Sequence, residues 1–161
     1  MGLDITAYSN VVKAENPDYD EYEGFEFIVY DNGFNQYSPL EKDIGYDAED
    51  EFGFRAGSYS GYGVWRNWLC QLVHGVTSEE LWENIDDYKG KAFVELINFS
   101  DCEGTLGTDV CKKLLKDFSD NQDLMSELDN DDEAMSYFIS SYYKWKEAFV
   151  YGADDGCVQF H

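Results

Sequence analysis

The chain contains only two arginines, and they enclose one segment that is rich in glycine, serine and tyrosine. A guanidinium can hold a phosphate or carboxylate through two parallel hydrogen bonds. Small residues beside it would let an anion approach the backbone N–H groups at the start of a helix, and tyrosines could stack on a nucleotide-like ring. We therefore expect this segment to hold an anionic small molecule. The predicted ligand-binding residues are Arg55, Ser58, Tyr59, Ser60, Tyr62 and Arg66.

The same segment also has a purely structural interpretation. Its spacing matches neither the Gly-Lys-Ser/Thr end of a phosphate-binding loop nor the GxGxxG pattern of a dinucleotide fold. The chain holds 34 Asp plus Glu, so either arginine could join two elements through an internal salt bridge. Serine and glycine are common at the start of helices as well. The sequence leaves both interpretations open.

A second group of reactive side chains, Asp101, Cys102 and Glu103, lies together in one predicted loop. A cysteine nucleophile would need a base, for which the chain offers only His74 and His161. Neighbouring carboxylates make a thiol a poor nucleophile, because they disfavour the thiolate. The carboxylates and His161 could also bind a divalent metal, but no spacing indicates such a site. We therefore assign no catalytic residue, metal or cofactor, and a small Cys- or carboxylate-dependent hydrolase is the second alternative function.

The charge of the chain restricts its partners. Lys plus Arg number 11, and the formal net charge is -23, which excludes direct binding to nucleic acid or to an anionic membrane. Two acidic loops are expected, at residues 14–24 and 34–51. Duplex DNA carries one charge per ~1.7 Å, so this charge corresponds to roughly 40 Å of duplex, about the diameter of a compact domain of this length. The first alternative function is therefore an acidic inhibitor that imitates nucleic acid toward a DNA- or RNA-binding protein.

The hydrophobic pattern predicts a single α+β domain, residues 1–161, in which three or four helices pack on a small mixed sheet. The expected strands are residues 3–8, 25–30, 52–56, 92–99 and 156–161, of which 92–99 is the most apolar and should be central. One helix of about four turns should end near His74, with Trp68 in its buried stripe, and Thr77 should cap the next helix. Two further helices are expected, with inward side chains over residues 110–118 and 135–149.

The cysteines and the hydrophobic runs indicate a cellular location. The four cysteines have no close spacing, no apolar leader precedes them, and no run reaches the length of a membrane span. We therefore expect a cytoplasmic protein with free thiols.

Several sequence strings carry a family resemblance. MGLDITAY at the start, RAGSYSGY followed by WR, and ELINFSDCEG resemble a family of small proteins of bacteriophages, prophages and bacterial genomes, most without an assigned function. The resemblance covers nearly the whole chain and implies no catalytic residue. It implies a role in the cytoplasm of a bacterial host, in counter-defence, with an anionic small molecule or a basic host protein as the partner. The acidic loops lie outside these strings, which weakens the nucleic-acid-mimic interpretation.

Overall fold

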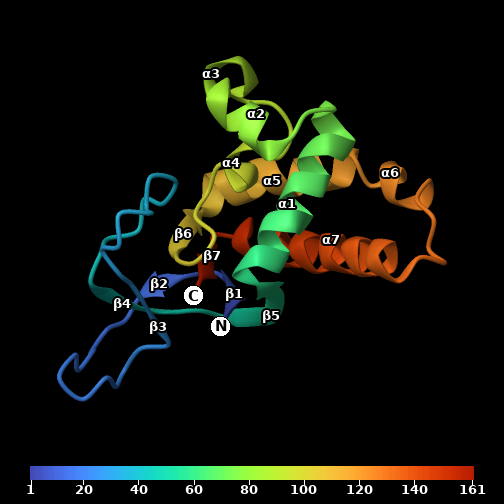
Figure 1. Ribbon diagram of the computed structural model, residues 1–161. Helices are drawn as coiled ribbons and strands as arrows, with labels where there is room; N and C mark the ends of the chain where they lie inside the picture. The colour runs from blue at the N-terminus through green and yellow to red at the C-terminus, as the bar shows by residue number, and fades with distance from the viewer.

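The computed structural model describes residues 1–161 and has the predicted α+β architecture (Figure 1). Three helices are longer than the others: α1 (Tyr59–His74), α5 (Thr108–Asp120) and α7 (Glu133–Gly152). Short helices complete the set: α2 (Ser78–Glu83), α3 (Ile85–Tyr88), α4 (Val94–Ile97) and α6 (Asp123–Ser126). No helix is both long enough and apolar enough to cross a membrane.

The main sheet has four strands in the order β5 (Asp50–Ser58), β1 (Gly2–Ser9), β7 (Cys157–Phe160) and β6 (Gly104–Gly107), and all its pairings are antiparallel. Alternation places Leu3, Ile5 and Ala7 of β1 on one buried face, as the period of a strand requires. The two chain ends meet in this sheet, because Asp4 and His161 exchange two backbone hydrogen bonds of 2.8 and 2.9 Å. The predicted strands at both ends of the chain are thus confirmed.

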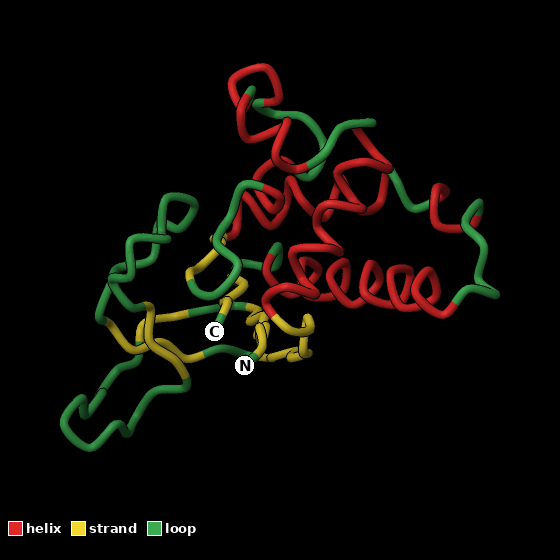
Figure 2. Tube along the Cα trace, in the orientation of Figure 1, coloured by secondary structure: helices red, strands yellow, loops and turns green.

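The helices cover one face of this sheet and enclose an aromatic core. Figure 2 shows the helices gathered on one side of the molecule, with the long loops on the other. Trp145 of α7 lies near the centre of the core, where its ring contacts those of Phe54, Tyr62 and Phe160 at centroid distances of 5.2 to 5.5 Å. Such edge and offset contacts between rings stabilise a core beyond the effect of the area they bury.

A second, three-stranded sheet departs from the sequence prediction. Its order is β2 (Val12–Lys13), β4 (Ile44–Asp47) and β3 (Phe27–Val29). The predicted acidic loop 34–51 therefore contains a strand, and β5 begins inside it. The segment gains its own core, because Tyr8, Phe27, Val29, Tyr46 and Cys157 form a separate buried cluster. Residues 14–24, by contrast, form the expected loop, whose only strand-like feature is an isolated bridge.

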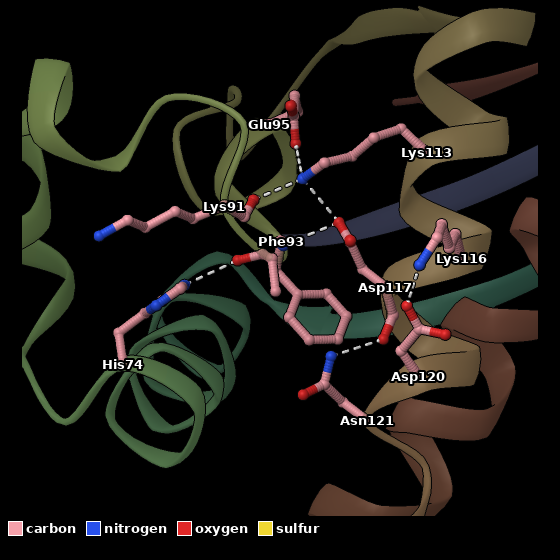
Figure 3. A network of polar contacts seen from close by, with 10 residues as sticks. His74, Lys91, Phe93, Glu95, Lys113, Lys116, Asp117, Asp120 and Asn121 are labelled. Atoms are coloured by element: carbon pink, nitrogen blue, oxygen red, sulfur yellow. Dashed lines mark hydrogen bonds and ion pairs between the residues drawn. The ribbon is translucent and has the colours of Figure 1, made fainter.

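The prediction of a central strand at residues 92–99 is wrong, because this run forms a turn and the short helix α4. Phe93 adopts a left-handed backbone with φ of 63°, which a strand does not allow. Its N–H donates to a carboxylate oxygen of Asp117 on α5 at 2.9 Å instead of to a neighbouring strand (Figure 3). An apolar run of this length fits a buried strand or a buried turn equally well, and the contact with Asp117 decides between them.

A half-buried ion network secures this turn against α5. The ammonium of Lys113 lies 2.7 Å from carboxylate oxygens of both Glu95 and Asp117, and it also donates to the carbonyl of Lys91 (Figure 3). On the other side, Nε2 of His74 lies 2.7 Å from the carbonyl oxygen of Ala92. The turn is thus held by side chains from α1 and α5, and it leads into the loop at residue 100.

The ends of α1 follow the predicted signals, and so does its apolar stripe except at Trp68. The side chain of Ser58 accepts the N–H of Gly61, and Gly75 ends the helix in the left-handed conformation. Thr77 caps α2 as expected. Trp68, expected to be buried, is 37% exposed, because it lies at the edge of the face that α1 turns toward the core.

Candidate functional site

The two arginines lie in different environments. Arg55 is opposite Asp4 in the pairing of β5 with β1, and its Nη1 lies 3.1 Å from the carboxylate Oδ2 of Asp4. Both side chains are about half-exposed, so this is a surface ion pair between two strands. Arg55 is thus paired with a carboxylate of the same chain, as the structural interpretation expects. It does not line the hollow that Arg66 lines.

Arg66 is buried and has no carboxylate partner. The residue is 6% exposed on the inner side of α1, and no Asp or Glu forms an ion pair with it. Its Nη1 donates a hydrogen bond of 2.7 Å to the carbonyl oxygen of Phe99, while Nε has no hydrogen-bond partner. A buried cation is costly unless it is paired, so an unpaired guanidinium is unexpected in a chain with 34 carboxylates.

Two aromatic rings flank the guanidinium. Its central carbon lies 5.1 Å from the ring centre of Tyr62 and 5.2 Å from that of Trp82, within the range of cation–π attraction. Burial raises the pKa of Tyr62, the charge of Arg66 lowers it, and that of Asp101 raises it. Because Tyr62 is completely buried, it packs below Arg66 in the core and offers no surface on which a ligand ring could stack, contrary to the sequence prediction.

Arg66 opens onto a hollow of about 290 Å³ that is also lined by Asp101 and Cys102 of the second predicted group, but not by Glu103. Polar side chains from the segment after α4 line one wall. The hollow is lined by Phe34, Arg66, Trp82, Asn98, Phe99, Ser100, Asp101 and Cys102. Phe34 and Trp82 expose 37% and 38% of their surfaces, so two partly accessible aromatic side chains line the hollow even though Tyr62 is buried.

The loop beside Arg66 is an ordered turn. The hydroxyl oxygen of Ser100 accepts the N–H groups of Cys102 and Glu103 at 3.2 and 3.1 Å. The sulfur of Cys102 lies 3.6 Å from the same hydroxyl. Because its oxygen accepts both N–H groups, the hydroxyl proton of Ser100 is left to donate to the sulfur or to a ligand.

The residues suggested for hydrolysis do not form one hydrogen-bonded set. Nε2 of His161 lies 2.7 Å from the hydroxyl of Thr6, and His74 is engaged with the turn before α4. Cys102 therefore has no histidine base in hydrogen-bond contact. Asp101 and Glu103 are exposed on the same turn, and no group of three Asp, Glu, His or Cys side chains is placed to hold a metal ion.

The remaining predicted ligand residues lie at the start of α1, outside the hollow. Ser58 is occupied as the helix cap, and its hydroxyl oxygen lies 3.2 Å from that of Ser60. Tyr59 is partly buried against the core. Of the six predicted ligand-binding residues, Arg66 alone lines the hollow. The candidate site therefore consists of this arginine and the turn after α4.

Sequence reasoning missed Phe34, Trp82, Asn98 and Phe99 as lining residues, because tertiary packing alone brings them to Arg66. One signal did point to the site. The strings RAGSYSGY…WR and ELINFSDCEG, distant in the sequence, meet where Arg66 reaches the turn at Ser100.

Comparison with protein-family models, with curated proteins and with solved structures gives no match.

Proposed function

We propose that the protein binds a small anionic molecule, with a phosphate or carboxylate group held by Arg66. The observation that carries this proposal is the buried guanidinium without a carboxylate partner at the wall of an open hollow. An anion in the hollow would supply the missing counter-charge, and the low local dielectric would strengthen the attraction.

The hollow favours a ligand that carries both a charge and a ring. Ser100 adds a hydroxyl donor beside Arg66, while the exposed faces of Phe34 and Trp82 offer stacking surfaces. Nucleotides combine these features, because their phosphate is anionic and every base has a flat face. A nucleotide-like ligand is therefore the class we infer, and capture of such a molecule in a bacterial host would agree with the counter-defence role implied by the resemblance to phage proteins.

Calorimetric titration with inorganic phosphate and with AMP tests the proposal. The Arg66→Met variant should lose binding of both, whereas Arg55→Met, which removes the other arginine outside the hollow, should bind as the unchanged protein does. Loss of binding in both variants would indicate a general charge effect and contradict the proposal.

A second variant avoids the risk that a substitution at a buried residue disturbs folding. Asn98 is exposed at the hollow, so Asn98→Asp adds a negative charge there without changing the core. We expect it to weaken phosphate and AMP binding about fivefold, while the exposed Asn130→Asp, the same charge change elsewhere, leaves the affinity unaltered. Equal effects from both variants, or no binding of either probe to the unchanged protein, would overturn the proposal.

A further inference from the structure

A groove between α1 and α7 lies apart from the arginine hollow. It consists of one hollow of about 620 Å³ and a neighbouring one of about 370 Å³, and Trp68 and Phe138 line both. We define the α1–α7 groove by Val64, Trp68, Leu72, Met135, Tyr137 and Phe138. Neither Arg66 nor the turn at Ser100 lines it, so it is independent of the proposed anion site.

The groove exposes an unusual amount of apolar surface in a chain this acidic. Val64 is 51% exposed, Tyr137 52% and Trp68 37%. Along α1 the lining residues Gly61, Val64, Trp68 and Leu72 recur at intervals of three and four, so they form one stripe along about 17 Å of the helix. A contiguous apolar stripe of this kind marks an interaction site, whereas single exposed apolar side chains carry no such meaning.

The charges at this groove are all negative. Asp132 and Glu133, at the start of α7, line its larger hollow, and Asp129 and Asp131 are exposed just before them. No lysine or arginine lines either hollow. One oxygen of Asp132 caps α7 by accepting the N–H of Met135 at 2.9 Å, but Glu133 has neither an ion pair nor a side-chain hydrogen bond. The groove thus combines an apolar floor with an unneutralised acidic end.

We propose that the α1–α7 groove binds a basic amphipathic helix of another protein. A helix lays one apolar stripe into a groove formed by two helices, and its lysines or arginines would face the carboxylates before α7. A second copy of this chain does not suit the groove, because two molecules of net charge -23 would bring acidic surfaces together. The length of the stripe on α1 corresponds to about three helical turns of such a partner.

The test uses the full chain and a labelled synthetic peptide of about eighteen residues, or five helical turns. The peptide consists of leucine, alanine and lysine, with leucines at intervals of three and four so that they form one face. A second peptide of the same composition has its order scrambled to remove that face. Fluorescence anisotropy at about 0.15 M salt measures both affinities, so that screening limits unspecific attraction. We expect the amphipathic peptide to bind at least tenfold more tightly than the scrambled one.

Two matched variants locate the binding. Val64→Lys places a positive charge in the groove, and Val150→Lys makes the same change on α7, at a valine of similar exposure (49% against 51%) that lines neither hollow. Val64→Lys should weaken binding about tenfold, and Val150→Lys less than twofold. Both positions are exposed, so both variants should fold, and circular dichroism checks this.

Equal weakening by the two variants, equal affinity for the two peptides, or no peptide binding would each overturn the proposal. Binding of a small uncharged aromatic probe at Trp68 in the absence of peptide binding would overturn it as well, and would assign the groove to a small ligand. The Arg66→Met variant should bind the peptide normally, which keeps this test separate from that of the anion site.

Discussion

Arg66 and Asp101 line the same hollow without forming an ion pair. The two charges nevertheless act on one group: burial raises the pKa of Tyr62, Arg66 lowers it, and Asp101 raises it further. Asp101 is exposed to water, whereas Arg66 is buried. The hollow therefore has a fixed positive charge in its wall and a negative charge, screened by water, at its surface. An anion that enters the hollow could pair with Arg66, which Asp101 does not do.

This arrangement predicts that Asp101 limits anion affinity. Asp101→Asn removes a negative charge that repels the ligand and keeps the shape of the side chain. We expect the dissociation constants for inorganic phosphate and AMP to fall about twofold to fivefold, as measured by calorimetric titration. Asp87→Asn, an equal change of charge at an exposed residue outside the hollow, is the control and should alter neither constant. Weaker binding by Asp101→Asn would mean that Asp101 contacts the ligand as an acceptor.

The four cysteines should differ sharply in reactivity. Cys102 is the one partly exposed thiol, and the others are buried. Burial raises the pKa of Cys70 to about 11 and that of Cys157 to about 12, and it raises the pKa of Cys111 well above its ordinary value. Iodoacetamide at pH 8 should therefore add one group to the folded protein and four after unfolding, as intact mass shows.

Identifying the cysteine that reacts with iodoacetamide in the folded protein tests whether a thiol lies in the hollow. Cys102→Ser should abolish the fast modification, and a saturating anionic ligand should slow it, because Cys102 lines the hollow. Fast modification of a second thiol in the folded protein would show that a buried cysteine is accessible and would contradict the packing of the core.

The sequence predicted the parts of the fold that are determined locally. The end of α1 at Gly75, the Thr77 cap and the alternating strand β1 were all predictable because capping residues and a period of two act over a few residues. Residues 92–99 were not, since an apolar run alone does not distinguish a strand from a buried turn. The turn is favoured by a single hydrogen bond, which the N–H of Phe93 donates to the carboxylate of Asp117, 24 positions along the chain.

At the candidate site, too, the sequence predicted what local residues determine but not what tertiary contacts determine. Arginine between small residues was a sound local reason to examine both Arg55 and Arg66, but the sequence could not show that one is paired and the other is not. That difference depends on Asp4, which is the cross-strand neighbour of Arg55, and on the packing of Trp82 and Tyr62 against Arg66. Pairing across strands and around a helix is a property of the tertiary structure.

The half-buried pair of Lys113 and Asp117 predicts a pH dependence. Burial raises the pKa of Asp117 above its ordinary value of 3.8, while hydrogen bonds from Lys113 and the N–H of Phe93 lower it and partly offset that effect. A carboxyl whose folded pKa is raised contributes its full stability below about pH 3.8 and loses it as the pH rises through the folded value. Carbon-detected NMR should accordingly show Asp117 titrating above pH 3.8 in the folded protein.

Removing the ammonium group of Lys113 should enlarge this upward shift of the Asp117 pKa. In Lys113→Met the pKa of Asp117 should rise further, and the free energy of unfolding in urea should fall more at pH 7 than at pH 3.5, where Asp117 is protonated. Lys89→Met removes an exposed lysine paired with Asp86 and is the control, with little expected change. Equal loss of stability in the two variants at pH 7 would show that the network contributes less than its geometry implies. Titration of Asp117 below 3.8 would contradict the predicted direction, because the contacts with Lys113 and Phe93 would then outweigh the effect of burial.

Two glycines provide the last test, because the structure predicts opposite effects of the same substitution. Gly63 lies within α1, and a methyl group added there meets no atom within 4 Å, so Gly63→Ala should raise the free energy of unfolding by about 1 kcal/mol through helix propensity. Gly156 joins α7 to β7, and an added methyl group would overlap the carbonyl oxygen of Tyr8 and approach that of Tyr151 at 2.8 Å. Backbone atoms in a sheet cannot move aside as a flexible side chain can, so Gly156→Ala should cost more than about 2 kcal/mol. Urea unfolding of both variants measures the two effects, and a neutral Gly156→Ala would show that β1 and β7 are less tightly joined than their hydrogen bonds indicate.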